Sequence, residues 1–379
     1  MTISRLSQRS IVVAIPARNE ADRIGDCLDA LARQRDSANF QVLLLLNNCT
    51  DRTAAIARDR ASQSRLRMHI CEVTLPSFRA NAGHARALAM QQAAALAGPD
   101  GVLLTTDADA RVYPNWLSAN LSALERGCDA VAGRAEIDPI EAALIPSILH
   151  EDDARECAYA EALDEIDALM DPDPADPWPR HSEHSGASIA VTVQAYQRAG
   201  GIPAVNLGED RAFFKALRSI DARIRHAPDI SVIVSGRTEG RAPGGMADTI
   251  RRRMIQPDTM IDDRLEPAVN AARRAWLRNN FRRAWEVQDR RYALALVEAL
   301  SLEPAEIVKR LGSDYFGAAW EAIEQGSPAL GRQRVAVADL ANEMSRAAGI
   351  LRMLHGQRLP SAALIDPADT QAPADAPSG

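Results

Sequence analysis

The stretch Val102-Leu-Leu-Thr-Thr-Asp107-Ala108-Asp109 carries the sharpest signal in this chain of 379 residues. An apolar run is followed by two carboxylates that are one residue apart. The run is typical of a buried strand, so both aspartates stand where the chain leaves a sheet. Ligands of open α/β sheets bind beyond the carboxyl ends of the strands, and Mg²⁺ prefers carboxylate oxygens. We therefore expect Asp107 and Asp109 to hold a divalent metal ion; the alternative is a turn or helix-capping pair.

Short apolar runs alternate with helical stretches on both sides of these aspartates, between residues 10 and 134. We expect strands at 11–15, 41–46, 68–73, 101–106 and from 130 onward, and helices at 21–35, 51–65, 84–97 and 115–126. Short strands separated by helices of ten or more residues form βαβ units with a buried, mostly parallel sheet. The predicted fold class is therefore α/β.

Residues 135–183 interrupt this alternation with fifteen acidic residues and only two arginines. The segment has a net charge of −13 while the whole chain has −7, so the remainder is mildly basic at +6. Its pattern indicates an acidic helical insertion that ends in the turn-rich sequence 171–179. We expect it to lie over the acceptor side of the site, where it would favour a neutral or cationic acceptor.

The rest of the chain divides into three parts. Residues 184–249 return to α/β character, with strands at 188–193 and near 230–234 and a helix at 209–220. The first domain is therefore expected to span 1–249, including the acidic insertion. A helical C-terminal subdomain is expected over 250–358, and it is a candidate surface for homo-oligomer formation. Residues 359–379 are small, polar and rich in proline, which predicts a disordered tail.

Composition excludes several classes of protein. With 46% hydrophobic and 25% charged residues, the chain is typical of globular proteins in water. Its acidic balance and its aromatic content of 4% argue against a nucleic-acid binder. No apolar run approaches the roughly 18–20 residues of a membrane helix, and no signal-peptide core is recognisable. The five scattered cysteines fit a reducing compartment, so we expect a cytoplasmic protein without an integral membrane segment.

Six short motifs, taken in order, resemble the inverting glycosyltransferases of family 2, which have the GT-A fold. The first is Ile11-Val-Val-Ala-Ile-Pro-Ala-Arg-Asn-Glu20, which is similar to that family's first strand with its Pro-x-x-Asn-Glu ending. The others are the strand–turn–helix at 47–53, the Asn-x-Gly helix start at 81–86, the metal motif at 107–109, the acceptor-side strand and turn at 184–188 and 200–201, and the base motif at 208–210. The resemblance covers roughly residues 10–250 and implies a GT-A domain, a Rossmann-like nucleotide-diphospho-sugar transferase.

This resemblance implies transfer of a sugar from a UDP- or GDP-sugar to a hydroxyl acceptor that the sequence does not identify. Mg²⁺ or Mn²⁺ on Asp109 would bridge the diphosphate, and Asp107 would reach the ribose or the metal. Asp210, beside Glu209, would take the acceptor proton; the alternative is helix N-capping, which the two acids alone would favour and the other motifs outweigh. His226 matches a late metal ligand of some GT-A enzymes, with a structural histidine as the alternative. The implied donor-binding residues are Pro16, Arg18, Glu20, Asn47, Asp51, Asn81, Arg86, Asp107, Ala108 and Asp109.

Two places depart from the pattern or stay open. The family commonly has an Asp-Asp pair at the end of the second strand, where this chain has Leu46 and Asn47. Asparagine can read a base edge as donor and acceptor but supplies no carboxylate, so the nucleotide base is not assigned. The glycine-rich stretch 235–245, which contains Arg237 and Arg241, suits either a loop that closes over phosphates or a domain linker.

Three other functions remain alternatives. A retaining GT-A enzyme of the sugar–glycerate synthase kind shares the fold and the Asp-x-Asp motif but needs no general base. A degenerate GT-A domain would act as a binding protein, although the full set of aspartates speaks against it. A sugar-phosphate nucleotidyltransferase is a weaker rival, because the chain lacks a glycine-rich N-terminal loop with a basic residue.

Overall fold

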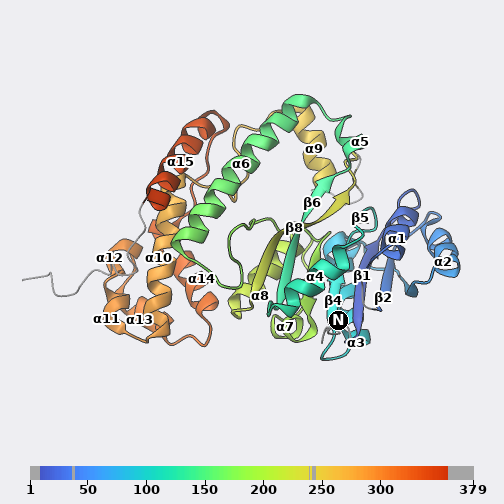
Figure 1. Cartoon of the computed structure of the whole chain (residues 1–379), viewed down its shortest axis with the longest axis horizontal. Coiled ribbons are helices and arrows are strands. Elements are labelled where there is room, and N and C mark those ends of the chain that lie inside the picture. Colours follow the sequence, from blue (N-terminus) through green and yellow to red (C-terminus); the bar gives the residue numbers. More distant parts are fainter. Residues whose placement is uncertain (1–8, 36–38, 239, 241–244, 357–379) are drawn as a thin grey trace, which may run out of the picture.

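The computed structural model describes residues 9–35, 39–238, 240 and 245–356, and its described strands form one mixed sheet (Figure 1). The strand order is β3-β2-β1-β4-β7-β6-β8-β5. The strands are β1 Ile11–Ala17, β2 Gln41–Asn47, β3 Arg67–Val73, β4 Val102–Thr105, β5 Arg111–Val112, β6 Ala130–Ile137, β7 Ile189–Thr192 and β8 Ile224–Val234. The α/β fold class predicted from the sequence is confirmed.

The two halves of the sheet differ in strand direction. β1 pairs in parallel with β2 and β4, and β2 pairs in parallel with β3, as the βαβ pattern predicts. β7 then runs antiparallel to both β4 and β6, and the two-residue β5 runs antiparallel to β8. β6 and β8 pair in parallel, so six of the eight described strands run in one direction and only β7 and β5 are reversed. The sheet is mixed, and most of its strands are parallel, as expected. The buried strands β1, β2 and β4 read as continuous apolar runs because helices cover both of their faces.

Two sets of helices cover the sheet, each with its own buried cluster. One face packs against α1 Ile24–Ala32, α2 Thr53–Gln63 and α4 Trp116–Glu125. The other packs against α3 Ala82–Ala97, α7 Val193–Arg198 and α8 Glu209–Ser219. A short 3₁₀ turn, η2 Ser77–Arg79, precedes α3, whose first turn is capped by the side chain of Asn81. The starts of α3 and α8 lie close together, since a Cβ atom at Gly83 would be 3.4 Å from Cβ of Glu209.

The chain after residue 246 is helical. Its elements are α9 Met246–Ile255, α10 Ala268–Glu286, α11 Arg290–Leu294, α12 Val297–Leu300, α13 Pro304–Leu311, α14 Phe316–Gly326, η3 Pro328–Leu330, η4 Val337–Asp339 and α15 Leu340–Gly356. The acidic segment forms α5 Pro139–Ala142 and the long α6 Ser147–Met170. Figure 1 shows α6 reaching from the sheet domain to α10 and α15, and Tyr159 and Ile166 are buried there with Ala268 and Leu340.

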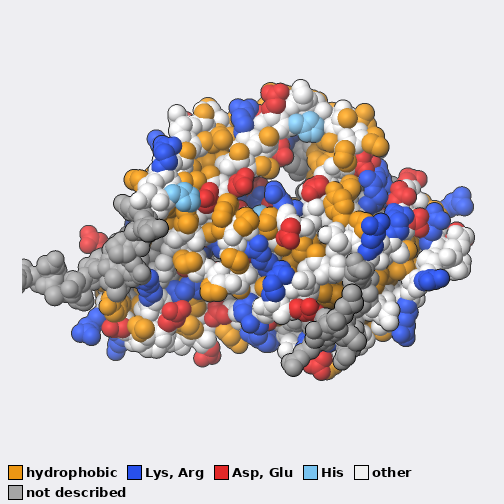
Figure 2. All heavy atoms as spheres, in the orientation of Figure 1, with side chains coloured by type: hydrophobic (Ala, Val, Ile, Leu, Met, Phe, Trp, Pro, Cys, Tyr) orange, Lys and Arg blue, Asp and Glu red, His pale blue; other side chains and the backbone are white. Residues whose placement is uncertain are grey.

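Several carboxylates of the acidic segment form ion pairs with arginines elsewhere in the chain or within the segment. Asp171, at the end of α6, has a side chain that is 1% exposed and pairs with Arg278 and Arg282 of α10. Asp167 pairs with Arg278 and with Arg180. Figure 2 shows acidic and basic side chains interspersed on this face of the molecule. These ion pairs stabilise the packing of the acidic segment against other segments. The sequence analysis predicted only an effect of this segment on the acceptor and did not predict this structural role.

Some of the sequence predictions concern residues that the structure does not describe. The predicted disordered tail at 359–379 and Arg241 of the glycine-rich stretch both lie outside the described residues. Within the described part of the chain, none of the helices combines the length and the apolar character that a bilayer crossing requires.

Candidate functional site

A cavity of about 240 Å³ opens at the carboxyl ends of β1, β2 and β4. Ligands of α/β proteins bind at this edge of the sheet. Nine of the ten predicted donor-binding residues line the cavity: Pro16, Arg18, Glu20, Asn47, Asn81, Arg86, Asp107, Ala108 and Asp109. The loop after β8 adds Ser235 and Arg237 to the lining, and Ser185 and Met246 also contribute. The strand ends therefore bring residues that are far apart in the sequence into one site.

The two aspartates after β4 line this cavity, and the alanines between and after them are buried. Ala108 is 4% exposed and Ala110 is fully buried. Burial and the neighbouring charge of Asp107 raise the pKa of Asp109 to about 7, although Arg237 opposes the shift. Asp107 forms an ion pair with Arg86. Negative charge is thus concentrated in a partly desolvated place, which is an arrangement that a bound cation would stabilise.

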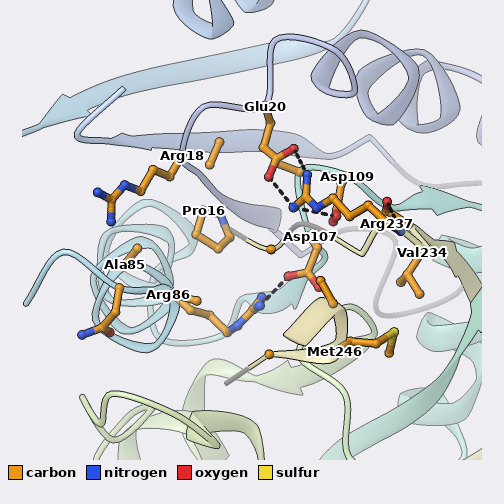
Figure 3. Close-up of a pocket in the computed structure, with 18 of the residues that line it drawn as sticks. Pro16, Arg18, Glu20, Ala85, Arg86, Asp107, Asp109, Val234, Arg237 and Met246 are labelled. Atoms are coloured by element: carbon orange, nitrogen blue, oxygen red, sulfur yellow. Dashed lines mark hydrogen bonds and ion pairs between the residues drawn. The ribbon is translucent and has the colours of Figure 1, made fainter. Parts of the chain in front are cut away.

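Arg237 supplies positive charge to the centre of the cavity (Figure 3). Its guanidinium donates to both carboxylate oxygens of Glu20, at 2.7 and 2.8 Å, and lies 3.1 Å from Oδ2 of Asp109. Glu141 of α5 holds the loop by accepting from Oγ of Ser235 at 3.0 Å and from the backbone N–H of Gly236 at 2.5 Å. The sequence marked Arg237 only as a basic residue of a glycine-rich stretch. Its place in the cavity depends on the path of the chain after β8.

Arg86 connects the metal motif to the predicted base motif. The residue is 4% exposed, and its Nε donates to Glu209 at 3.0 Å. Nη1 donates to Oγ1 of Thr105 at 2.9 Å and to the carbonyl of Gly186 at 2.8 Å, and Nη2 donates to Asp107. Because four of its five N–H groups are engaged, Arg86 is better suited to holding these segments than to contacting a diphosphate.

Glycine is required at position 186 by the close approach of this arginine. A Cβ atom at Gly186 would lie 2.6 Å from the guanidinium carbon of Arg86. The backbone N–H of Gly186 donates to Oδ2 of Asp210 at 3.1 Å, and Oδ1 of Asp210 accepts from the N–H of Arg211 at 2.7 Å. Burial, followed by the charge of Glu209, raises the pKa of Asp210. Neither Asp210 nor Glu209 is part of the cavity lining: Asp210 is bonded to Gly186, which follows the lining residue Ser185, and Glu209 is 8% exposed and bound to Arg86.

Asn47 and Asp51, both predicted to bind the donor, are placed differently. Asn47 lines the cavity and is 1% exposed, and its Oδ1 has no hydrogen-bond partner among the described residues. Asp51 is not part of the lining. Its carboxylate accepts from the N–H of Ala21 at 3.1 Å and from the N–H of Thr53 at 3.0 Å. It thereby joins the turn after β1 to the start of α2, which is a structural use.

His226, the predicted late metal ligand, is not brought to the aspartates. It lies on β8, outside the cavity lining. Its Nδ1 is 2.7 Å from Oδ2 of Asp176, and its Nε2 is 3.1 Å from Nε2 of His184. Both ring nitrogens are therefore already engaged. Within the described residues, no group of three or more His, Cys, Asp or Glu side chains is arranged to hold a metal ion by itself.

Comparison with known proteins identifies the N-terminal part of the chain. Residues 12–164 match the model of the family described as Glycosyl transferase family 2. No curated protein sequence gives a significant match.

Solved structures with a related fold share little sequence with this chain. S. aureus TarS, in complex with UDP-GlcNAc, is 14% identical over 92% of each chain, with a TM-score of 0.47. A mannosyltransferase from Pyrobaculum calidifontis, in complex with GDP-Man and Mn²⁺, is 18% identical over 84% of this chain and 86% of its own, with a TM-score of 0.41. Glucosyl-3-phosphoglycerate synthase from Mycobacterium tuberculosis, in complex with Mn²⁺, UDP and phosphoglyceric acid, is 17% identical over 67% and 82%, with a TM-score of 0.40. Likeness at this level carries no functional argument.

Proposed function

The chain belongs, through residues 12–164, to glycosyl transferase family 2, and from this premise we propose that it is a metal-dependent inverting glycosyltransferase. It would move a sugar from a nucleotide-diphosphate donor to a hydroxyl acceptor. The observation that carries the proposal is the shared cavity of Asp107, Asp109 and Asn47 at one edge of the sheet, with Asp210 bonded to Gly186, the neighbour of the lining residue Ser185.

The residues present fit a divalent cation. Asp109 and Asp107 offer carboxylate oxygens, and the raised pKa of Asp109 reflects burial and the charge of Asp107, both of which a bound cation would offset. Mg²⁺ and Mn²⁺ sites of this kind use one or two carboxylates and complete the coordination with water and substrate phosphates. This agrees with the lack of a three-ligand group in the described chain. When bound, the ion supplies Lewis-acid neutralisation of the charge on the leaving diphosphate.

The other cavity residues can bind and orient the donor. The unpartnered Oδ1 of Asn47 can accept a hydrogen bond from a nucleobase N–H, which would satisfy a buried polar atom. UDP- and GDP-sugars both present such a donor. Arg237 holds Glu20 and Asp109 through contacts that a phosphate can replace, because guanidinium binds carboxylate and phosphate in the same bidentate way.

The base role falls to Asp210. Burial and the charge of Glu209 raise the pKa of the Asp210 carboxylate, which makes Asp210 a stronger proton acceptor. Arg86 fixes the neighbouring Glu209 and the carbonyl of Gly186, so the segment around the base is held rigidly. Proton removal from an acceptor hydroxyl by Asp210 accompanies direct displacement of the diphosphate, and one displacement inverts the anomeric carbon.

The reaction is proposed to take place in the cytoplasm. The five cysteines are all free thiols, a state that a reducing compartment maintains. The acceptor is described only as a hydroxyl compound.

Product stereochemistry tests the proposal. The protein would be incubated with Mn²⁺ and α-linked UDP-glucose, UDP-N-acetylglucosamine or GDP-mannose, with water as the acceptor, and the first sugar released would be read by proton NMR. We expect the β anomer, and Asp210→Asn should abolish its formation. Release of the α anomer would support the retaining alternative and remove Asp210 from its role. Failure to bind or turn over any of the three donors would support a binding protein.

A further inference from the structure

A second group of titratable side chains lies outside the donor cavity. It consists of Asp176, His184 and His226, with His181 against the edge of His226 at a ring-centroid distance of 5.7 Å. Asp176 follows α6 in the turn-rich end of the acidic segment, whereas His226 lies on β8. The group therefore joins the acidic segment to the sheet.

Asp176 fixes the orientation of the His226 ring. The aspartate is 5% exposed; its Oδ1 accepts the backbone N–H of His226 at 2.9 Å, and its Oδ2 lies 2.7 Å from Nδ1. Because a carboxylate can only accept, Nδ1 of His226 carries a proton. Although burial opposes it, the hydrogen bonds from His226 hold the pKa of Asp176 below its ordinary value. In the neutral ring, Nε2 of His226 is then an acceptor for His184.

His184 passes this constraint to the segment beside the predicted base. Its Nε2 lies 3.1 Å from Nε2 of His226, and its ring stacks on Phe214 with centroids 4.4 Å apart and planes 14° apart. Phe214 is fully buried on α8, four residues after Asp210, so the two project from the same side of that helix. His184 is thus held by a hydrogen bond on one side and by stacking on the other.

The fixed position of His184 affects Asp210 through the two backbone residues that follow His184. Gly186 lies two positions after His184. Its N–H donates to Oδ2 of Asp210, and its carbonyl oxygen accepts a hydrogen bond from Arg86. Burial lowers the pKa of the His184 ring strongly, so the ring stays neutral and adds no charge beside the base.

We propose that the chain Asp176–His226–His184 positions Gly186 so that its N–H stays on the carboxylate of Asp210. The three are positioning residues, since they act through Gly186 and lie outside the cavity lining. The inference rests on the proposed function only in giving Asp210 the role of base. It also assigns to the end of the acidic segment a role in the site that its sequence does not show.

Hydrogen exchange of the Gly186 amide tests the contact without any substrate. Peptides that span residues 183–188 would be followed by mass spectrometry in Asp176→Asn and His184→Phe. His184→Phe keeps the stacking on Phe214 and removes only the hydrogen bond, so it retains the fold. We expect exchange at Gly186 to accelerate by roughly tenfold in both variants, as the loss of a buried hydrogen bond implies. Asp173→Asn, an exposed aspartate in the same turn, serves as the matched control and should change nothing. Unchanged exchange in His184→Phe would overturn the proposal.

The pH profile of donor turnover distinguishes this positioning role from the proposed glycosyltransferase function. The N–H of Gly186 lowers the pKa of Asp210, against the effects of burial and of Glu209. Its loss should shift the acidic limb of the kcat profile to higher pH, while Mn²⁺-dependent nucleotide binding stays as in the wild type. A fully active Asp210→Asn would refute the base and not the contact. An inactive Asp210→Asn together with an unshifted limb in His184→Phe would refute the positioning role alone.

Discussion

Two groups of carboxylates and arginines in this molecule use the same residue types with opposite results. In the closed group between α6 and α10, the carboxylate of Asp171 meets two arginines, Arg278 and Arg282. Although burial opposes it, this surplus of positive charge lowers the pKa of Asp171. In the cavity at the strand ends, by contrast, burial and then the charges of Asp107 and Glu20 raise the pKa of Asp109 to about 7, although Arg237 opposes the shift.

The difference separates packing from binding. The closed group is satisfied by the chain itself, so it stabilises the contact between the acidic helix and the C-terminal helices. In the cavity, Asp109 is buried beside two other carboxylates, those of Asp107 and Glu20, in a place open to ligands, and a bound cation can lower the free energy of that state. Perturbed acids in a cavity mark a functional site for this reason, while perturbed acids in a closed ion-pair group do not.

The largest expected effect comes from the cavity. Asp109→Asn should lower donor turnover by about 10³-fold, because a metal ligand that neutralises the leaving group is worth several kcal/mol in the transition state. Stability should hold or increase, since the change removes a repelled carboxylate. Steady-state kinetics with Mn²⁺ and thermal unfolding of the same preparation provide the two readouts. A fully active Asp109→Asn enzyme would contradict the assignment of the cavity, rather than the closed group, as the functional site.

The closed group should respond in the reverse way. Asp171→Ala leaves Arg278 and Arg282 without their buried partner, so the free energy of unfolding should fall by about 3 kcal/mol. Nucleotide binding should be unchanged, as measured by calorimetry on the folded protein. The exposed Asp173→Asn, which keeps the oxygen that accepts from the N–H of Ala175, is the control and should cost less than about 0.5 kcal/mol. Equal losses in both variants would mean that the closed group does not stabilise the fold.

Asp164 of α6 gives a smaller, pH-dependent effect. Burial comes first among the causes that raise its pKa from 3.8 to about 7. Its ionised form is thus disfavoured in the folded state, so its penalty is absent below about pH 4 and grows until about pH 7. The full shift corresponds to about 4 kcal/mol, which solvent screening of this half-buried side chain reduces to about 2 kcal/mol.

Denaturant titrations at several pH values measure this penalty. Asp164→Asn should match the wild type near pH 4 and exceed its free energy of unfolding by about 2 kcal/mol at pH 8. A constant difference across this range would show that Asp164 does not titrate as described.

The features that the sequence predicted are those with local causes. The apolar runs of β1, β2 and β4 and the polar residues directly after them follow from neighbours in the chain, so Glu20, Asn47 and Asp109 were found. The direction of β7 depends on pairing with strands that are distant in sequence, which no local pattern reveals. The same holds for Arg237, whose place depends on the path taken after β8.

Residue roles were harder to predict than residue positions. Arg86 was among the residues expected to bind the donor, but four side-chain hydrogen bonds within the chain occupy it. Asp51 was expected at the donor, but it joins two turns instead. In both cases the sequence identified a polar residue near the strand ends, and only the arrangement of its partners decides what it does.

Isothermal titration calorimetry of UDP and GDP, each with and without Mn²⁺, tests most directly whether the carboxylate-rich cavity is a site for a nucleoside diphosphate and a metal ion. The wild type and Asp171→Ala should bind at least one of the two nucleotides only when Mn²⁺ is present, and Asp109→Asn should bind neither. Absence of Mn²⁺-dependent binding in the wild type, or undiminished binding in Asp109→Asn, would contradict the assignment of this cavity.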